Sequence, residues 1–253
     1  MWYQKPHFEV IKNIVAGVRL PQCFWGGMNC MKRTKLKDRT LPDYTHGEEI
    51  FNMVSHIVGG GLGVVYLVLC VIFAALHGNV WGVVGSAIYG ASVICLFTMS
   101  SVYHGVTHPT AKKVLQVIDH CTIYFMIAGT YTPITLCSLR EYNPFLGWGV
   151  FGFVWAIAAL ATTFTAIDLH KYKKFSMICY LALGWCIILA FKSTWEAVGT
   201  GAIVFLLLGG VLYSIGAVLY GIGKKKRYAH SLFHLFVDVA SLMHFFCIFF
   251  YII

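Results

Sequence analysis

Two histidines near the end of the chain have a spacing that suits metal binding. His230 and His234 are four positions apart, so on an α-helix they share one face and can hold one metal ion together. Many helices carry such a pair, and the pair alone is a weak signal. His104 adds a third imidazole from a distant part of the chain. Three neutral imidazoles with an open fourth position are the ligand set of a catalytic zinc, so these residues predict a zinc site.

An acid and a hydroxyl could complete a hydrolytic centre around such an ion. Asp119 could hydrogen-bond a water on the metal, either orienting it or taking its proton. Ser100 lies one helical turn before His104 on the same face, where its hydroxyl could reach that water or a substrate carbonyl. The alternative interpretation is that these polar groups hydrogen-bond only to one another and pin the helices together.

The composition indicates what must position these residues. Of the 253 residues, 58% are hydrophobic and 11% are charged, and the mean hydropathy is +0.73. Because a soluble domain has about 25% charged residues, the chain is predicted to be a membrane protein. The net charge of +9 does not indicate nucleic-acid binding, because Lys and Arg of membrane proteins gather on cytoplasmic loops. The nine cysteines have no regular spacing and are expected to be free thiols.

Seven stretches are long and apolar enough to cross a membrane, for which a helix needs about 20 mostly apolar residues. They lie at about 50–76, 80–104, 114–137, 144–167, 175–191, 200–223 and 229–253. The fifth stretch is the shortest, because Lys192 closes it early. The sequence therefore predicts an all-α membrane protein, a seven-transmembrane helix bundle.

The basic residues give this bundle an orientation. With seven spans, 17 of the 19 Lys and Arg residues fall on one side of the membrane, before the first span and after the second, fourth and sixth. The opposite side has only Arg140 and Lys192. Because basic loops stay in the cytoplasm, we expect the N-terminus in the cytoplasm and the C-terminus outside.

Residues 1–48 are expected to form a cytoplasmic arm, and residues 49–253 the transmembrane domain. The arm contains one amphipathic segment, from Phe8 to Leu20, with apolar residues on one helical face and basic residues that suit anionic lipid headgroups. This segment is consistent with a helix lying in the membrane interface, and equally with a disordered arm.

Placed on this topology, the unusual polar residues of four spans come to one level of the membrane. Ionisable groups inside a bilayer are costly and by default mark function. The residues concerned lie near the cytoplasmic ends of spans one, two, three and seven. They are Glu49, Asn52 and His56, then Ser100, Tyr103 and His104, then Asp119 and His120, and finally His230 and His234. Glu49, Asn52, His56, Tyr103 and His120 are expected to surround the metal ligands without binding the ion.

At these residues the sequence resembles the hemolysin III branch of the progestin and adipoQ receptors. The matching motifs run from about residue 45 to the C-terminus. They are Glu49-x2-Asn52-x2-Ser55-His56, Ser100-x3-His104, Asp119-His120 followed by Ala128-Gly-Thr-Tyr-Thr-Pro133, and His230-x3-His234. Each motif is weak alone, and together they are highly specific.

The resemblance implies a seven-helix bundle with a cytoplasmic N-terminus. It also implies a zinc held by His104, His230 and His234, with Asp119 bound through a water and Ser100 beside it. The family is similar to the alkaline ceramidases, and hydrolysis of lipid amide bonds has been inferred for some members. Other members are described as receptors, and the founding bacterial member as a pore-forming hemolysin.

Three functions follow from these residues and this resemblance. We favour a zinc-dependent hydrolase of a membrane lipid with a ceramide-like amide bond. The second hypothesis is a receptor-like protein, or one in which zinc only holds the helices together. The third is a cytolytic pore; a simple channel would need polar residues across the whole membrane depth, and here the outer halves of the spans are nearly uncharged.

The expected partners are membrane lipids and a lipid substrate or ligand, with no nucleic acid. The expected location is the plasma membrane, and the oligomeric state stays open.

Overall fold

The computed structural model describes residues 33–223 and 226–253, and residues 34–253 belong to one compact unit. Every regular element among the described residues is a helix, with no strand. The amphipathic segment expected from Phe8 to Leu20 lies outside the described residues.

The helices follow one another with short connectors. They are η1 (Leu36–Asp38), α2 (His46–Leu76), α3 (Val80–Gly105), α4 (Pro109–Pro133), the π-helical turn η2 (Ile134–Leu139), α5 (Arg140–Tyr142), α6 (Pro144–Ile167), α7 (Lys173–Trp185), the 3-10 turn η3 (Cys186–Ala190), α8 (Phe191–Ile222) and α9 (Ala229–Tyr251). Six helical stretches of the described chain are long and apolar enough to cross a membrane.

The longest of these stretches, Lys173–Ile222, contains both the fifth and the sixth expected spans. Its 50 residues would measure about 75 Å as one straight helix, more than twice the roughly 30 Å of a bilayer core. The stretch is interrupted at Gly199, whose φ of 79° and ψ of 170° are not helical. Glycine adopts this positive φ without a steric penalty, so the two expected spans lie on either side of a break that only glycine tolerates well.

Local sequence signals set where the helices begin. Thr45 caps α2, and Glu48 completes a capping box by accepting a hydrogen bond from the Thr45 backbone N–H. Asn79 and Asn143 accept hydrogen bonds at the starts of α3 and α6. Pro109 stands in the first turn of α4, where its missing N–H costs nothing. These caps fix the ends of the helices that carry the polar residues.

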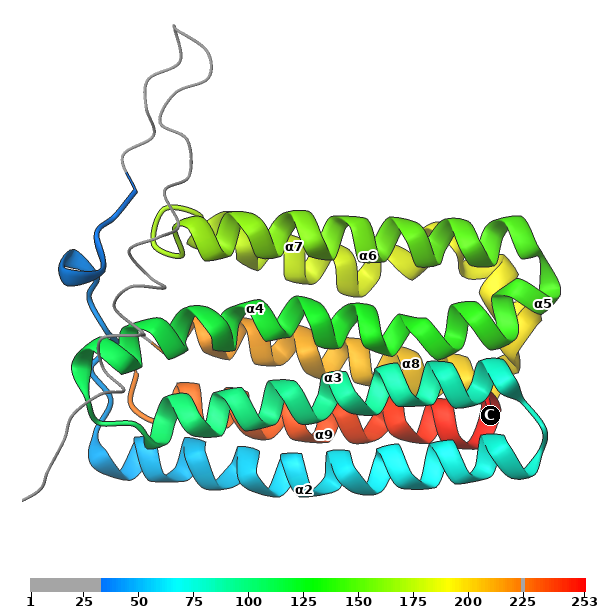
Figure 1. Ribbon diagram of the computed structural model, residues 1–253, viewed down its shortest axis with the longest axis horizontal. Helices are drawn as coiled ribbons and strands as arrows, with labels where there is room; N and C mark the ends of the chain where they lie inside the picture. Colours follow the sequence, from blue (N-terminus) through cyan, green and yellow to red (C-terminus); the bar gives the residue numbers. More distant parts are fainter. Residues whose placement is uncertain (1–32, 224–225) are drawn as a thin grey trace, which may run out of the picture. The chain divides into compact units, whose positions relative to one another are not determined.

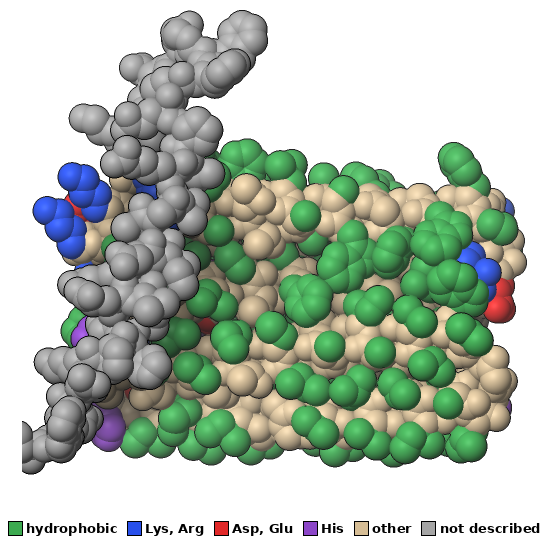
Figure 2. Space-filling model, viewed as in Figure 1, with side chains coloured by type: hydrophobic (Ala, Val, Ile, Leu, Met, Phe, Trp, Pro, Cys, Tyr) green, Lys and Arg blue, Asp and Glu red, His purple; other side chains and the backbone are tan. Residues whose placement is uncertain are grey.

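The helices pack side by side, with α2 against α3 and α9, α3 against α4, α4 against α6, and α8 against α9 (Figure 1). The start of α2, the end of α3, the start of α4 and the start of α9 lie at the same end of the bundle. Hydrophobic side chains cover the visible face between the two ends (Figure 2). Large apolar side chains such as Val58 and Leu189 are exposed, as expected of a surface that faces lipid.

Residues 34–45 precede α2 and are attached to the same end of the bundle. The Thr34 backbone N–H donates to the Asp168 carboxylate at 2.7 Å, and Nε2 of His170 lies 3.2 Å from the Thr40 carbonyl oxygen. Burial alone raises the pKa of Asp168. The hydrogen bonds from Thr34 and Lys171 and the charge of Arg39 outweigh it and lower the pKa to about 2.

We expect Asp168→Asn to lower the free energy of unfolding by roughly 1–2 kcal/mol at neutral pH, because charge-assisted hydrogen bonds are lost. Since the pKa of the folded carboxyl lies below the ordinary value of 3.8, its contribution is present above about pH 4 and is lost as the pH falls toward 2. Thermal unfolding of both proteins from pH 7 to pH 2 would measure this. Asp38→Asn, at an exposed acid in η1, is the control. A gap between mutant and wild type that did not narrow below pH 4 would contradict the prediction.

Candidate metal centre

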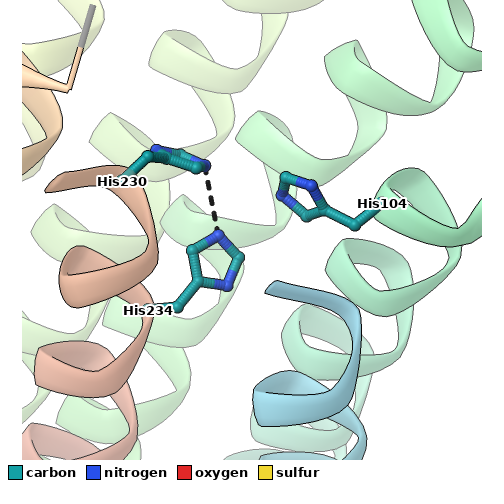
Figure 3. A group of neighbouring side chains, drawn as sticks. All are labelled: His104, His230 and His234. Atoms are coloured by element: carbon teal, nitrogen blue, oxygen red, sulfur yellow. Dashed lines mark hydrogen bonds between the residues drawn. The ribbon is translucent and has the colours of Figure 1, made fainter. Parts of the chain in front are cut away.

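The first two turns of α9 bring two imidazoles together edge to face, with an interplanar angle of 72°. Nε2 of His230 and Nε2 of His234 are 3.2 Å apart, and both residues are buried. The spacing of four positions places both rings on the inner face of α9, as the sequence predicts. Figure 3 shows the two rings turned toward the same space between the helices.

His104, from the last turn of α3, points into that space from the opposite side (Figure 3). One ligand atom from each of His104, His230 and His234 can be chosen so that all three lie within 4.8 Å of one another. His104 Nε2 is buried and has no hydrogen-bond partner among the described residues. A buried nitrogen without a partner is costly, and a cation bound between the three imidazoles would remove that cost. These three histidines could therefore hold a metal ion.

The carboxylate of Glu49 determines which nitrogen of His104 faces this space. Glu49 Oε2 lies 2.6 Å from His104 Nδ1, and Glu49 Oε1 lies 2.8 Å from the ammonium of Lys112. A neutral His104 donates its Nδ1–H to Glu49, which leaves the lone pair of Nε2 directed at the other two histidines. Lys112 balances the charge of Glu49, so α2, α3 and α4 meet at one ion-paired contact.

The carboxylate of Glu48 holds the backbone at the start of α9. Its Oε1 accepts a hydrogen bond of 2.7 Å from the backbone N–H of Tyr228, two residues before His230. Tyr228 has a φ of 60°, in the left-handed region that a non-glycine residue seldom adopts. The bond to Glu48 compensates for this strained conformation, which turns the chain into α9 and directs His230 inward.

Two further polar residues of α2 point into the bundle at this level. The His56 ring lies 3.9 Å from the His234 ring, measured between centroids, and 4.9 Å from Phe97. His56 is outside the group of mutually close ligand atoms, so it borders the three histidines instead of joining them. Asn52 is fully buried, and its amide has no hydrogen-bond partner among the described residues.

Ser100 and Asp119 line the same cavity as His230 and His234. The neighbouring hydroxyl of Ser101 donates a hydrogen bond of 2.7 Å to a carbonyl group of its own helix, that of Phe97. The Ser100 hydroxyl has no such partner in the described part of the chain. It is therefore available to a bound molecule.

Tyr103 and His120 also line this cavity. Tyr103 packs edge-on against His104, and its hydroxyl accepts a hydrogen bond from Gln116. His120 lies beside Asp119, with Nδ1 at 3.5 Å from Asp119 Oδ2, and its Nε2 is 3.0 Å from the hydroxyl of Tyr220. Neither Asp119 nor His120 belongs to the group of three possible metal ligands.

The cavity is long, narrow and mostly apolar, with a volume of about 160 Å³. Along α4 and the start of η2 its lining extends from Gln116 to Ile134, which corresponds to about 27 Å at 1.5 Å per residue. Leu96, Ile123 and Leu206 contribute to its wall. Its shape and lining suit a hydrocarbon chain with a polar group near Asp119.

Two further ionisable residues of α9, Asp238 and His244, lie deeper in the bundle than the three histidines. Asp238 reaches from α9 to α2, where its Oδ1 lies against Gly59 without a hydrogen-bond partner among the described residues. His244 lies further along α9, at the distant part of the cavity, with Nε2 at 3.2 Å from the Leu206 carbonyl oxygen. Neither belongs to the group of three ligands.

Three residues contact the site without being predicted from the sequence as part of it: Tyr44, Glu48 and Lys112. The Tyr44 ring stacks on His230 with 4.7 Å between ring centres. Burial, and then the nearby Tyr103 hydroxyl, raises the pKa of Tyr44, so its hydroxyl stays protonated and can donate. Glu48 carries a signal, because Thr45-x2-Glu48 reads as a capping box, but its bond to Tyr228 depends on the tertiary structure.

A family model described as Haemolysin-III related matches residues 44–245 of the chain. The chain is 37% identical to Hemolysin-3 of Bacillus cereus over 81% of this chain and 92% of that protein. It is also 37% identical to a Hemolysin-3 homolog of Bacillus subtilis, over 82% of this chain and 96% of that protein. The human monocyte to macrophage differentiation factor is 29% identical over 92% of this chain and 86% of its own length.

We expect Glu49→Gln to weaken binding of a divalent metal ion by about 10- to 100-fold, because a neutral amide polarises His104 less and leaves its orientation less fixed. Equilibrium titration against a competing chelator would measure the affinity. Glu141→Gln, at an exposed acid in α5, is the matched control and should bind as wild type does. Equal affinities for Glu49→Gln and the control would show that the carboxylate does not tune the site.

Proposed function

The chain belongs to the haemolysin-III-related family, and on that premise we propose that it is a zinc-dependent hydrolase of a membrane lipid. The observation that carries the proposal is the position of Ser100 and Asp119, which line one apolar cavity together with His230 and His234. A lipid whose hydrocarbon chain lies in this cavity would bring its polar group to these side chains.

His104, His230 and His234 would hold the zinc. Imidazole nitrogens are usual zinc ligands, and a set of three leaves a position open for a reactant. A zinc ion bound there would polarise a substrate carbonyl and acidify water.

The reaction we propose is hydrolysis of the amide bond of a ceramide-like lipid. A water molecule attacks the carbonyl carbon while Asp119 takes one of its protons. The Ser100 hydroxyl donates a hydrogen bond to the carbonyl oxygen as negative charge develops on it. The C–N bond then breaks, the proton passes from Asp119 to the leaving amine, and a fatty acid and a free amine result.

The cavity supports this choice of substrate. A lipid would place its acyl chain along the apolar wall formed by residues such as Ile123 and Leu206, with the amide at Ser100 and Asp119. The apolar wall also keeps bulk water away from the polar side chains, which strengthens electrostatic interactions between them. Membrane lipids are thus the proposed partners, and the large exposed apolar surface and its few charged side chains speak against nucleic acid.

We further propose seven membrane crossings, with Gly199 separating the fifth from the sixth. The length of Lys173–Ile222 supports two crossings for this stretch. The basic residues support an N-terminus in the cytoplasm, an external C-terminus and a reaction at the cytoplasmic side. We propose the plasma membrane as the location.

A cytolytic activity is the second candidate, because the bacterial relatives carry the name Hemolysin-3. The apolar lining of the cavity favours a hydrocarbon chain over a stream of water or ions. Leakage of a dye from liposomes that was equal for wild type, His104→Ala and His230→Ala would favour a pore over the hydrolase.

Purified protein loaded with zinc should release fatty acid from ceramides of some chain length. We expect Asp119→Asn to lower the turnover number by about 10²- to 10⁴-fold, because the proton acceptor is lost. Ser100→Ala should lower it by about 10²- to 10³-fold, because the carbonyl oxygen loses a donor. Mass spectrometry of the released products would measure both.

Ser101→Ala is the matched control for Ser100→Ala, since the neighbouring hydroxyl is bonded within its own helix. It should retain wild-type turnover. No turnover across a panel of ceramides and phospholipids, with one zinc bound per chain, would overturn the hydrolase.

A protease site added after Ile253 should be cut by protease outside intact cells, and the same site added before Met1 should be protected. This outcome follows from an odd number of crossings with the basic loops inside. Immunoblotting of the cleaved tags would measure it. Both sites behaving alike would mean an even number of crossings.

A further inference from the structure

A second pocket, with a volume of about 310 Å³, lies beside the metal centre and is more polar than the apolar cavity, so we call it the polar pocket. Its wall includes Asp43, His170 and Lys173, which come from outside the apolar cavity. The pocket and the cavity share a wall made of Pro42, Tyr44, Gln116, His120 and Tyr220. The two spaces are therefore neighbours that side chains keep apart.

Tyr44 is the part of this wall that lies on the metal centre. Its ring stacks on the His230 ring at 4.7 Å and an interplanar angle of 15°, and it lies 5.8 Å from the His104 ring. Tyr220, on the other side, lies 5.6 Å from His230. Two tyrosine rings thus separate His230 from the polar pocket.

Tyr44 belongs to a segment that is attached at several points, residues 34–45, which we call the strap. Thr34 is bonded to Asp168, Thr40 to His170, and the Lys37 carbonyl accepts a hydrogen bond of 3.0 Å from the Lys113 ammonium. Each attachment joins the strap to the connector before α7 or to the start of α4. Thr45 then ends it at the cap of α2.

The apolar cavity encloses one side of the metal centre mainly with hydrocarbon. The three histidines are 1–6% exposed, and the cavity beside them is lined mainly by hydrocarbon. A divalent ion cannot cross hydrocarbon without losing its hydration, which is very costly. The second pocket offers such an ion a path that avoids this hydrocarbon.

We propose that the polar pocket is the route by which a hydrated divalent metal ion enters and leaves the histidine centre, and that Tyr44 closes this route. The proposal rests on the metal centre of the proposed function. Asp43, His120 and His170 offer oxygen and nitrogen ligands along the pocket wall. The Lys173 ammonium lies 5.1 Å from the centre of the Tyr220 ring, in a cation–π contact on this wall.

Tyr44 acts here as a positioning residue, because it touches His230 and not the reacting atoms. Its stacked ring restrains His230 and excludes water from that side of the centre. Removing the ring exposes His230 to the polar pocket, so the ion exchanges faster. Removing the hydrogen bond between Thr34 and Asp168 loosens the strap, so we expect it to speed metal exchange as well. Asp168 itself is not one of the three metal ligands.

Stopped-flow release of zinc to an excess of a fluorescent chelator, from full-length protein in nanodiscs, tests the proposal. We expect Tyr44→Ala to release zinc about tenfold faster than wild type, which corresponds to about 1.4 kcal/mol. Tyr44→Phe keeps the stacked ring and should release zinc within about twofold of wild type. Asp168→Asn should also accelerate release, and Tyr142→Ala, at an exposed tyrosine of α5, should not.

Zinc stoichiometry and thermal stability are measured on the same samples. One zinc per chain with equal release rates for wild type, Tyr44→Ala and Asp168→Asn would overturn the strap while leaving the metal centre intact. If Tyr44→Ala does not fold, an unchanged rate for Asp168→Asn overturns the proposal by itself. Wild type that binds no zinc would overturn the proposed metal centre, and the strap proposal with it.

Discussion

Two neighbouring carboxylates at the start of α2 hold together the end of the bundle on which the site is built. Glu49 pairs with His104 of α3 and Lys112 of α4, and Glu48 accepts the Tyr228 N–H at the start of α9. A charged group left without a partner in an apolar bundle is very costly, so each bond restrains the helix that supplies the partner. Histidines from α3 and α9 meet because four helix ends are tied to two adjacent side chains.

Much of the site follows from periodic features of the sequence. The pairing of His230 with His234 needs only the helical repeat, and the depth of His104 in its span predicts that it lies at the same level of the membrane. Tyr44 has no such signal, because it lies in a segment without helical periodicity. Its stack on His230 depends on the path of the strap, which is set by contacts of Thr34 and Thr40 with residues more than one hundred positions away.

The expected and observed helices differ most around α7 and α8. Hydropathy ends the fifth span at Lys192, because a charge stops a membrane crossing. The helical structure continues past Lys192 to the break at Gly199, because a charged side chain does not prevent the backbone hydrogen bonds of a helix. A span and a helix are thus defined by different physics, one by transfer from water and the other by local bonding.

The unpartnered hydroxyl of Ser100 sets a fixed depth inside the bundle. Among the hydroxyls that line the cavity, Thr130 and Ser214 donate to carbonyl groups of their own helices, as the neighbouring Ser101 does. A chain that slides along an apolar wall has no preferred register, since every methylene group fits as well as the next. A single free donor near the end of the wall would fix the position of the polar group of a bound lipid. The length of its hydrocarbon chain would then decide how far along the cavity it reaches.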